Sequence, residues 1–115
     1  MLRTSKEMQV ERREKMRGGE GVVQIKHLFK EGDLQGKTRL VAEVTIPIGG
    51  SIGYHQHDQE EEVFYCISGR GIVNDNDQDK EFNTGDALVT GSGRGHSVKN
   101  VGNEPLVLMA VILTY

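Results

Sequence analysis

The chain has 115 residues, of which 36% are hydrophobic, and it carries a formal net charge of −3. This length allows one domain and excludes two independent hydrophobic cores. The sequence contains 15 Gly but only two Pro and no Trp, whereas an average composition would give about eight Gly. Such an excess without low complexity indicates many tight turns, and therefore many short strands.

The composition also excludes several classes of protein. No apolar run reaches the roughly 18 residues of a membrane-spanning helix, so we expect no membrane partner. The first residues are too charged to contain the apolar stretch of a secretory signal. Cys66 is the only cysteine, which excludes an internal disulfide and agrees with a cytoplasmic localisation. The acidic net charge gives no reason to expect nucleic-acid binding.

Residues 1–21 form a charged N-terminal arm that precedes the main domain, residues 22–115. The first 17 residues of the arm carry six Lys/Arg against three Glu. We expect a frayed terminus or a short helix here, because Gly18 and Gly19 end any helix. A basic arm on an acidic body can bind anions, but we favour a solvated segment or one that docks on a neighbouring subunit.

Beyond the arm, short alternating segments follow one another, and turn signals recur about every 8 to 12 residues. No window of helical periodicity competes with them. The pattern predicts an all-β fold, a single small β-barrel. Turns are expected at 31–36, at Gly49-Gly50, between Gly69 and Gly71, and at the polar tip 75–79. The predicted strands cover, in chain order, 22–29, 40–46, 54–57, 62–67, 80–83, 87–90, 96–101 and 106–113.

Two of the four histidines stand at i and i+2 in one predicted strand. His55 and His57 therefore point to the same face, about 6.5–7 Å apart along the strand, and both can reach one metal ion. Glu62 opens the next strand, and His96 opens a further one after the Gly-rich segment 91–95. Three imidazoles and one carboxylate leave one or two positions open on a divalent ion.

The spacing of these residues resembles the two sequence motifs of the cupin family. The first motif reads Gly, five residues, His-x-His, three or four residues, Glu, six residues, Gly; its positions are filled by Gly49, His55, His57, Glu62 and Gly69. The second motif is matched by Gly85, Gly93, His96 and Asn100, while Gly91 stands where the family has Pro. Since Gly is less restricted than Pro, we expect a freer loop before His96.

The resemblance covers about residues 49–100 and implies a cupin-like double-stranded β-helix, or jelly roll. It also implies that His55, His57, Glu62 and His96 are the metal ligands. The cofactor is then a divalent transition metal, one of Fe, Mn, Ni, Zn, Co or Cu.

Several residues outside the motifs have simpler interpretations. His27 matches neither motif and is expected to be structural. Glu60 and Glu61 are interpreted as solvated loop carboxylates, because only Glu62 keeps the motif spacing. The acidic run Asp75-x-Asp77-x-Asp79 resembles the start of a calcium loop. However, Lys80 occupies the position that requires Gly, so a hairpin turn is the better interpretation.

Four residues are predicted to line a substrate pocket near the metal: Tyr54, Phe64, Cys66 and Phe82. Arg39 and Arg94 are candidate anchors for an anion. The strand 62–67 is apolar on both faces, and the segment 106–113 is continuously apolar. Because apolar outer faces need a cover, we expect a homodimer.

The ligand set predicts metal binding but not a reaction. We favour a metal-dependent enzyme that acts on a small organic molecule, for example a dioxygenase. The alternatives are a non-catalytic barrel that binds or senses a small molecule, and a metal-dependent isomerase. An isomerase needs a general base beside the substrate, and the sequence offers no convincing one.

Overall fold

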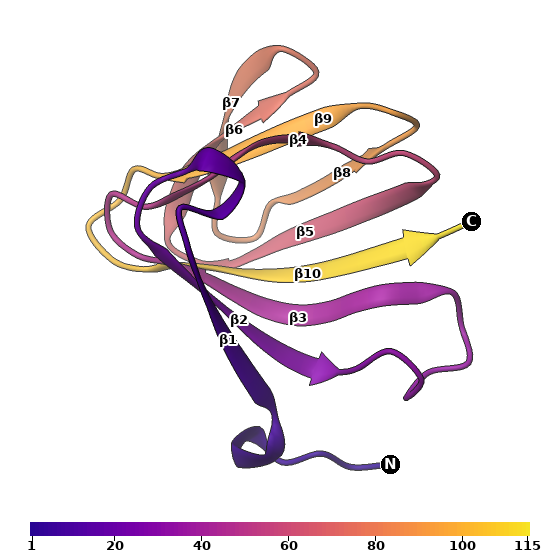
Figure 1. The fold of residues 1–115 in the computed structure, drawn as a ribbon. Coiled ribbons are helices and arrows are strands. Elements are labelled where there is room, and N and C mark those ends of the chain that lie inside the picture. Colours follow the sequence, from indigo (N-terminus) through magenta and orange to yellow (C-terminus); the bar gives the residue numbers. More distant parts are fainter.

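The computed structural model describes residues 1–115, which form ten strands and two single-turn 3-10 helices (Figure 1). The predicted all-β class is confirmed. No helix in the structure has the length and apolar character needed to cross a membrane. The elements are η1 (Ser5–Glu7), β1 (Gln9–Glu14), η2 (Met16–Gly18), β2 (Val22–Phe29), β3 (Thr38–Ile46), β4 (Ser51–Gln56), β5 (Glu60–Ser68), β6 (Arg70–Asp75), β7 (Gln78–Asn83), β8 (Ala87–Gly91), β9 (Gly95–Asn100) and β10 (Leu106–Thr114).

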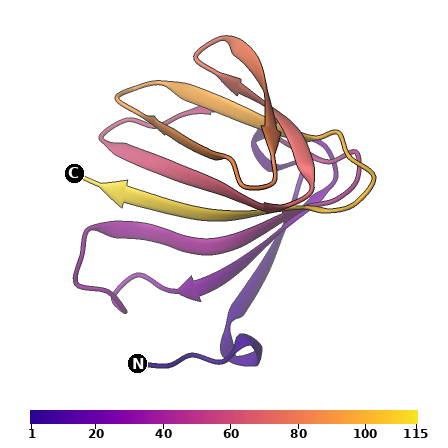
Figure 2. The ribbon, with the colours of Figure 1, turned by 180° about the vertical axis from the view of Figure 1, so that it is seen from behind.

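The strands form two antiparallel sheets that face each other as a jelly roll. One sheet has the order β1-β2-β3-β10-β5-β8, and the other has the order β4-β9-β6-β7. The strands converge at one end of the molecule and fan apart at the other, which the view from behind also shows (Figure 2). Connections between the sheets run at these ends, so residues far apart in the sequence meet inside the barrel.

Alternation along the strands builds the core between the two sheets. On β10, Leu106, Leu108, Ala110 and Ile112 are all buried, while the residues between them face outward. β10 pairs with both β3 and β5, so this row lies at the centre of the larger sheet. Each large apolar side chain buried in this way contributes about 1.5–3 kcal/mol to stability.

The structure confirms the eight strands predicted beyond the arm and adds β6, where the sequence suggested only a turn. Gly71 lies inside β6, and a Cβ atom there would be 2.6 Å from the carbonyl oxygen of Lys99 on β9. This glycine therefore marks a close approach of two strands rather than a turn. β6 and β7 join through Asn76 and Asp77, both with positive φ. This is the geometry of a two-residue hairpin turn, as expected for the acidic run.

The interpretation of the arm as a frayed or helical segment is wrong for residues 9–14. These residues form β1, which pairs antiparallel with β2 along its whole length, from Gln9 opposite His27 to Glu14 opposite Val22. Only one residue of β1, Val10, is hydrophobic, so no apolar pattern predicts the strand. The backbone hydrogen bonds to β2 define it instead.

The turn between β1 and β2 packs against β4 backbone to backbone (Figure 1). A Cβ atom at Gly53 would lie 2.0 Å from the carbonyl oxygen of Arg17, and one at Gly19 would lie 2.1 Å from that of Ser51. Two hydrogen bonds of 2.9 Å join Glu20 and Ser51. The Ser51 N–H donates to the Glu20 carbonyl, and the Glu20 N–H donates to the Ser51 hydroxyl. The arm is thereby fixed beside the strand that carries His55.

Two residues of the second motif have structural roles. The buried amide of Asn100 donates hydrogen bonds to the carbonyls of Ile46, Pro47 and Glu104. Gly91 ends β8 and pairs with Glu61, and a Cβ atom at Gly91 would be 2.7 Å from the Cβ of Glu61. The expected freer loop is therefore wrong at this position, because Gly91 is held in the sheet where a proline would collide with β5.

Candidate metal centre

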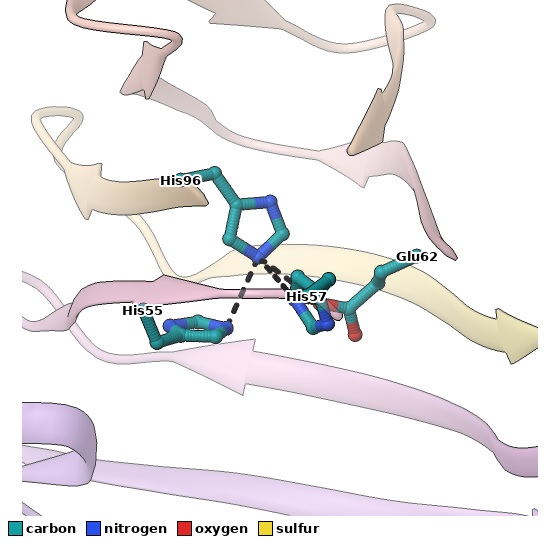
Figure 3. Close-up of side chains that lie close together, drawn as sticks. All are labelled: His55, His57, Glu62 and His96. Carbon is teal, nitrogen blue, oxygen red and sulfur yellow. Dashed lines mark hydrogen bonds and ion pairs between the residues drawn. The ribbon is translucent and has the colours of Figure 1, made fainter. Parts of the chain in front are cut away.

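Four side chains from three strands and one turn converge inside the barrel (Figure 3). His55 lies on β4, His57 directly follows that strand, Glu62 lies on β5 and His96 on β9. An irregularity in the β4–β9 pairing after Ile52 sets His55 directly opposite His96. One potential ligand atom from each residue lies within 4.8 Å of all the others. The predicted grouping of these four residues is thus present.

Four of the distances within the group are close to those between neighbouring ligands of one metal ion. His96 Nε2 is 3.1 Å from Nε2 of both His55 and His57. Glu62 Oε1 is 3.1 Å from Nε2 of His57 and of His96. Ligands at roughly 2.0–2.1 Å from one ion lie about 3.0 Å apart in octahedral and about 3.4 Å apart in tetrahedral geometry. The four distances of 3.1 Å lie between these two values, while the ligand atoms of the whole group lie within 4.8 Å of one another.

The outer nitrogen of each imidazole makes a hydrogen bond that orients its ring. His55 Nδ1 donates to the carbonyl of Gly53 at 2.8 Å, and His57 Nδ1 to the carboxylate of Glu60 at 2.6 Å. Since these oxygens only accept, the Nε2 lone pair of each of these two rings points to the centre when the ring is neutral. Lone pairs and a carboxylate oxygen directed at one point repel one another unless a cation lies between them. The donor set therefore fits a divalent metal ion.

Burial and charge set the protonation of the group. Burial lowers the pKa of His55 to about 4, so this ring is neutral at neutral pH. Burial alone would raise the pKa of Glu62, but hydrogen bonds with His57 and His96 hold this pKa below its usual value. The Glu62 carboxylate in turn raises the pKa of His57, so protons compete with a metal at that ligand.

Glu60 is not the solvated loop carboxylate that the sequence suggests. It is the first residue of β5, and its carboxylate accepts hydrogen bonds from Arg39 Nε at 2.7 Å and Nη2 at 2.8 Å, in addition to the one from His57. The Arg39 guanidinium lowers the pKa of Glu60 to about 2. A chain of hydrogen bonds from Arg39 through Glu60 thus orients the candidate metal ligand His57. Motif spacing alone does not reveal this role of Glu60.

A single cavity of about 70 Å³ reaches the cluster. Its apolar wall comes from both sheets, with Phe64 stacked on the His96 ring at a centroid distance of 4.8 Å. Three arginines complete the lining: Arg13 and Arg17 from the arm, and Arg39 from β3. The apolar lining residues are Met16, Ile25, Leu40, Val44, Ile52, Phe64 and Ile112.

Of the four residues predicted to line the pocket, only Phe64 does so. Cys66 and Phe82 are buried in the hydrophobic core, because the cavity lies elsewhere along the barrel. Tyr54 is half exposed and packs against Gly95, since it alternates with His55 on β4. Arg94 does not line the cavity either.

Sequence reasoning missed Arg13 and Arg17, because it placed the arm outside the barrel. The only signal for them was the basic charge of the arm. His27 lies outside the ligand group and pairs with Glu11, its Nε2 being 2.7 Å from the carboxylate.

The fold and the site together define the class of protein: a small jelly-roll barrel whose interior holds three histidines and one glutamate placed to bind a metal ion. Residues 42–112 match the cupin domain family, and the chain belongs to this family.

Two of the matches come from Thermotoga maritima. An oxalate-binding protein is 40% identical over 113 residues, which are 98% of this chain and 93% of that protein. A crystal structure described as a predicted oxalate decarboxylase has a TM-score of 0.95 and 39% identity, with both chains fully covered. The cupin domain of a Schizosaccharomyces pombe protein shares the fold at 18% identity, with a TM-score of 0.74 over 91% of this chain and 69% of that one.

We predict that Glu60→Gln weakens metal binding about 10- to 100-fold, because the partner of a ligating histidine loses its charge. Competition between the protein and a chromogenic chelator for Zn²⁺ measures this affinity. Glu61→Gln is the matched control, since the Glu61 carboxylate makes no hydrogen bond or ion pair with His55, His57, Glu62 or His96. Equal Zn²⁺ affinity in Glu60→Gln and the unmodified chain would show that Glu60 does not support the site.

Proposed function

We propose that this chain binds a small carboxylate at a divalent transition metal held by His55, His57, Glu62 and His96. The observation that carries the proposal is the cavity, which is lined by three arginines together with three members of the four-residue cluster, His55, His57 and Glu62. Three imidazoles and one carboxylate leave coordination positions for an exogenous ligand on an ion that takes five or six. Imidazole-rich sites suit Zn, Cu, Fe and Ni.

The size and lining of the cavity support a small anion. A cavity needs roughly 10–15 Å³ to hold one water molecule, so a cavity of about 70 Å³ can admit a small anion. The oxalate-binding relative supports a two-carbon dicarboxylate as the first ligand to test. We therefore take oxalate as the reference ligand.

We favour binding over turnover because of the titratable groups in the cavity. Apart from the proposed metal ligands, these groups are Arg13, Arg17 and Arg39. Guanidinium groups remain protonated in proteins and can hold an anion, but they cannot accept a proton as a general base.

We place the protein in the cytoplasm, in agreement with the unpaired Cys66.

We expect isothermal titration of the Mn²⁺-loaded chain with oxalate to show saturable binding that is lost after chelation of the metal. Oxalate should be recovered unchanged after prolonged incubation in air. Absence of binding to the loaded chain would contradict the proposal. Release of carbon dioxide or formate, or consumption of dioxygen, would replace binding by an enzymatic function.

We also propose that the chain forms a homodimer through the outer face of three adjacent strands. Antiparallel sheets usually present polar residues to water, yet here Tyr65, Ile67 and Val89 are 47%, 42% and 61% exposed. β5 lies between β10 and β8, so these residues form one continuous surface. Its apolar residues are Val63, Tyr65, Ile67, Ala87, Val89, Val107, Met109, Val111 and Leu113.

Light scattering should give twice the chain mass for the unmodified protein and the mass of one chain for Val89→Lys, because a buried unpaired charge opposes association. Val10→Lys is the control, since Val10 is exposed on β1, away from this face. A single-chain mass for the unmodified protein at micromolar concentration would contradict the dimer.

A further inference from the structure

We infer that Arg17 of the N-terminal arm binds a second carboxylate of the ligand, and so makes the site selective for dicarboxylates over monocarboxylates. This inference rests on the proposed function, in which a first carboxylate binds at the metal. Arg17 lines the same cavity as His55, His57 and Glu62. A ligand in this cavity therefore meets the cluster and the arm together.

The main chain fixes Arg17 at the edge of the cavity. Its φ of +54° places it in the left-handed region within the short turn η2. Hydrogen bonds of 2.9 Å from Gly18 N to Lys15 O and from Gly19 N to Met16 O close this turn. The Arg17 carbonyl also lies so close to Gly53 that any Cβ at Gly53 would displace it. The backbone that carries the Arg17 side chain is therefore held in one position.

The same contact joins the arm to the metal cluster. Gly53 packs against Arg17 through its α-carbon, and its carbonyl oxygen accepts the hydrogen bond from His55 Nδ1. One residue of β4 thus positions both a proposed metal ligand and the turn that carries the arginine. The arm is part of the wall of the site and not an appended segment.

Charge pairing distinguishes Arg17 from the other two arginines of the cavity. Arg13 donates to Glu11 at 2.9 Å, and Arg39 donates to Glu60 through two nitrogens. No carboxylate oxygen lies within 4.0 Å of the Arg17 guanidinium, which is thus the unpaired cation of the cavity lining. A planar guanidinium presents two parallel N–H groups that match one carboxylate.

These features favour a ligand with two carboxylates. The first carboxylate takes an open position on the metal, which keeps a positive charge after binding only Glu62 as an anionic ligand. The second carboxylate lies in the part of the cavity that the arm encloses, where Arg17 supplies a cation without an internal partner. A monocarboxylate makes only the first of these contacts.

The test compares oxalate with acetate by isothermal titration of the Mn²⁺-loaded full chain. We expect Arg17→Gln to weaken oxalate binding about 10-fold through loss of a charged hydrogen-bond pair, and to change acetate binding by less than about twofold. Arg12→Gln is the matched control, because Arg12 is a neighbouring arginine without an ion pair that does not line the cavity. Elemental analysis should give the same metal content in all three proteins.

Equal oxalate affinity in Arg17→Gln and the unmodified chain, or an equal loss of acetate binding, would overturn the role of Arg17 while leaving carboxylate binding intact. Failure of the unmodified, metal-loaded chain to bind either anion would instead overturn the carboxylate-binding function, and this inference with it. An equal loss of oxalate binding in Arg12→Gln would reduce the effect to the general charge of the arm, and would also contradict the inference.

Discussion

The direction of three imidazole rings and one carboxylate toward a single point is the constraint on which the site depends. Such an arrangement places lone pairs and negative charge against one another, and it persists only if each ring is held from behind. The carbonyl of Gly53, the carboxylate of Glu60 and the hydroxyl of Thr90 do this for His55, His57 and His96. A divalent cation at the centre converts the repulsion into coordination.

The barrel provides these supports through strand register and close backbone contacts. The irregular pairing of β4 with β9 sets two histidines opposite each other, and Glu62 pairs with Thr90, whose hydroxyl contacts His96. Gly91 allows β8 to approach β5 at this level. The motif glycine at Gly69 has a comparable role, because a Cβ there would lie 2.7 Å from the carbonyl oxygen of Pro105. The same close backbone contacts thus determine both the packing of the sheets and the geometry of the site.

The N-terminal arm increases the positive charge of the cavity lining. Without it, the cluster would face a mainly apolar wall with only Arg39, which already pairs with Glu60. β1 and η2 bring two further arginines to the cavity at the cost of an exposed, polar edge strand. A segment that contributes little to the core therefore supplies most of the positive charge around the proposed ligand.

The sequence was sufficient to predict the all-β barrel, eight of its strands and the grouping of the four ligands, because period-two alternation and motif spacing are local properties. It was insufficient for β1, whose partner β2 and not its own pattern makes it a strand. It also misplaced Cys66 and Phe82, because alternation gives the face of a residue but not its depth along the barrel. Tyr54 was misplaced for a different reason, since alternation with His55 sets it on the outer face of β4. Glu60 and Arg17 acquire their roles only through residues distant in the sequence, Arg39 and Gly53.

Elemental analysis of the untagged chain, dialysed after purification without added metal, tests the central claim most directly. Binding by four convergent ligands predicts about one equivalent of a divalent transition metal per chain, and loss of that metal in His96→Ala. A metal content far below one equivalent, even after exposure to Mn²⁺, Fe²⁺ or Zn²⁺ and removal of the excess, would contradict the account.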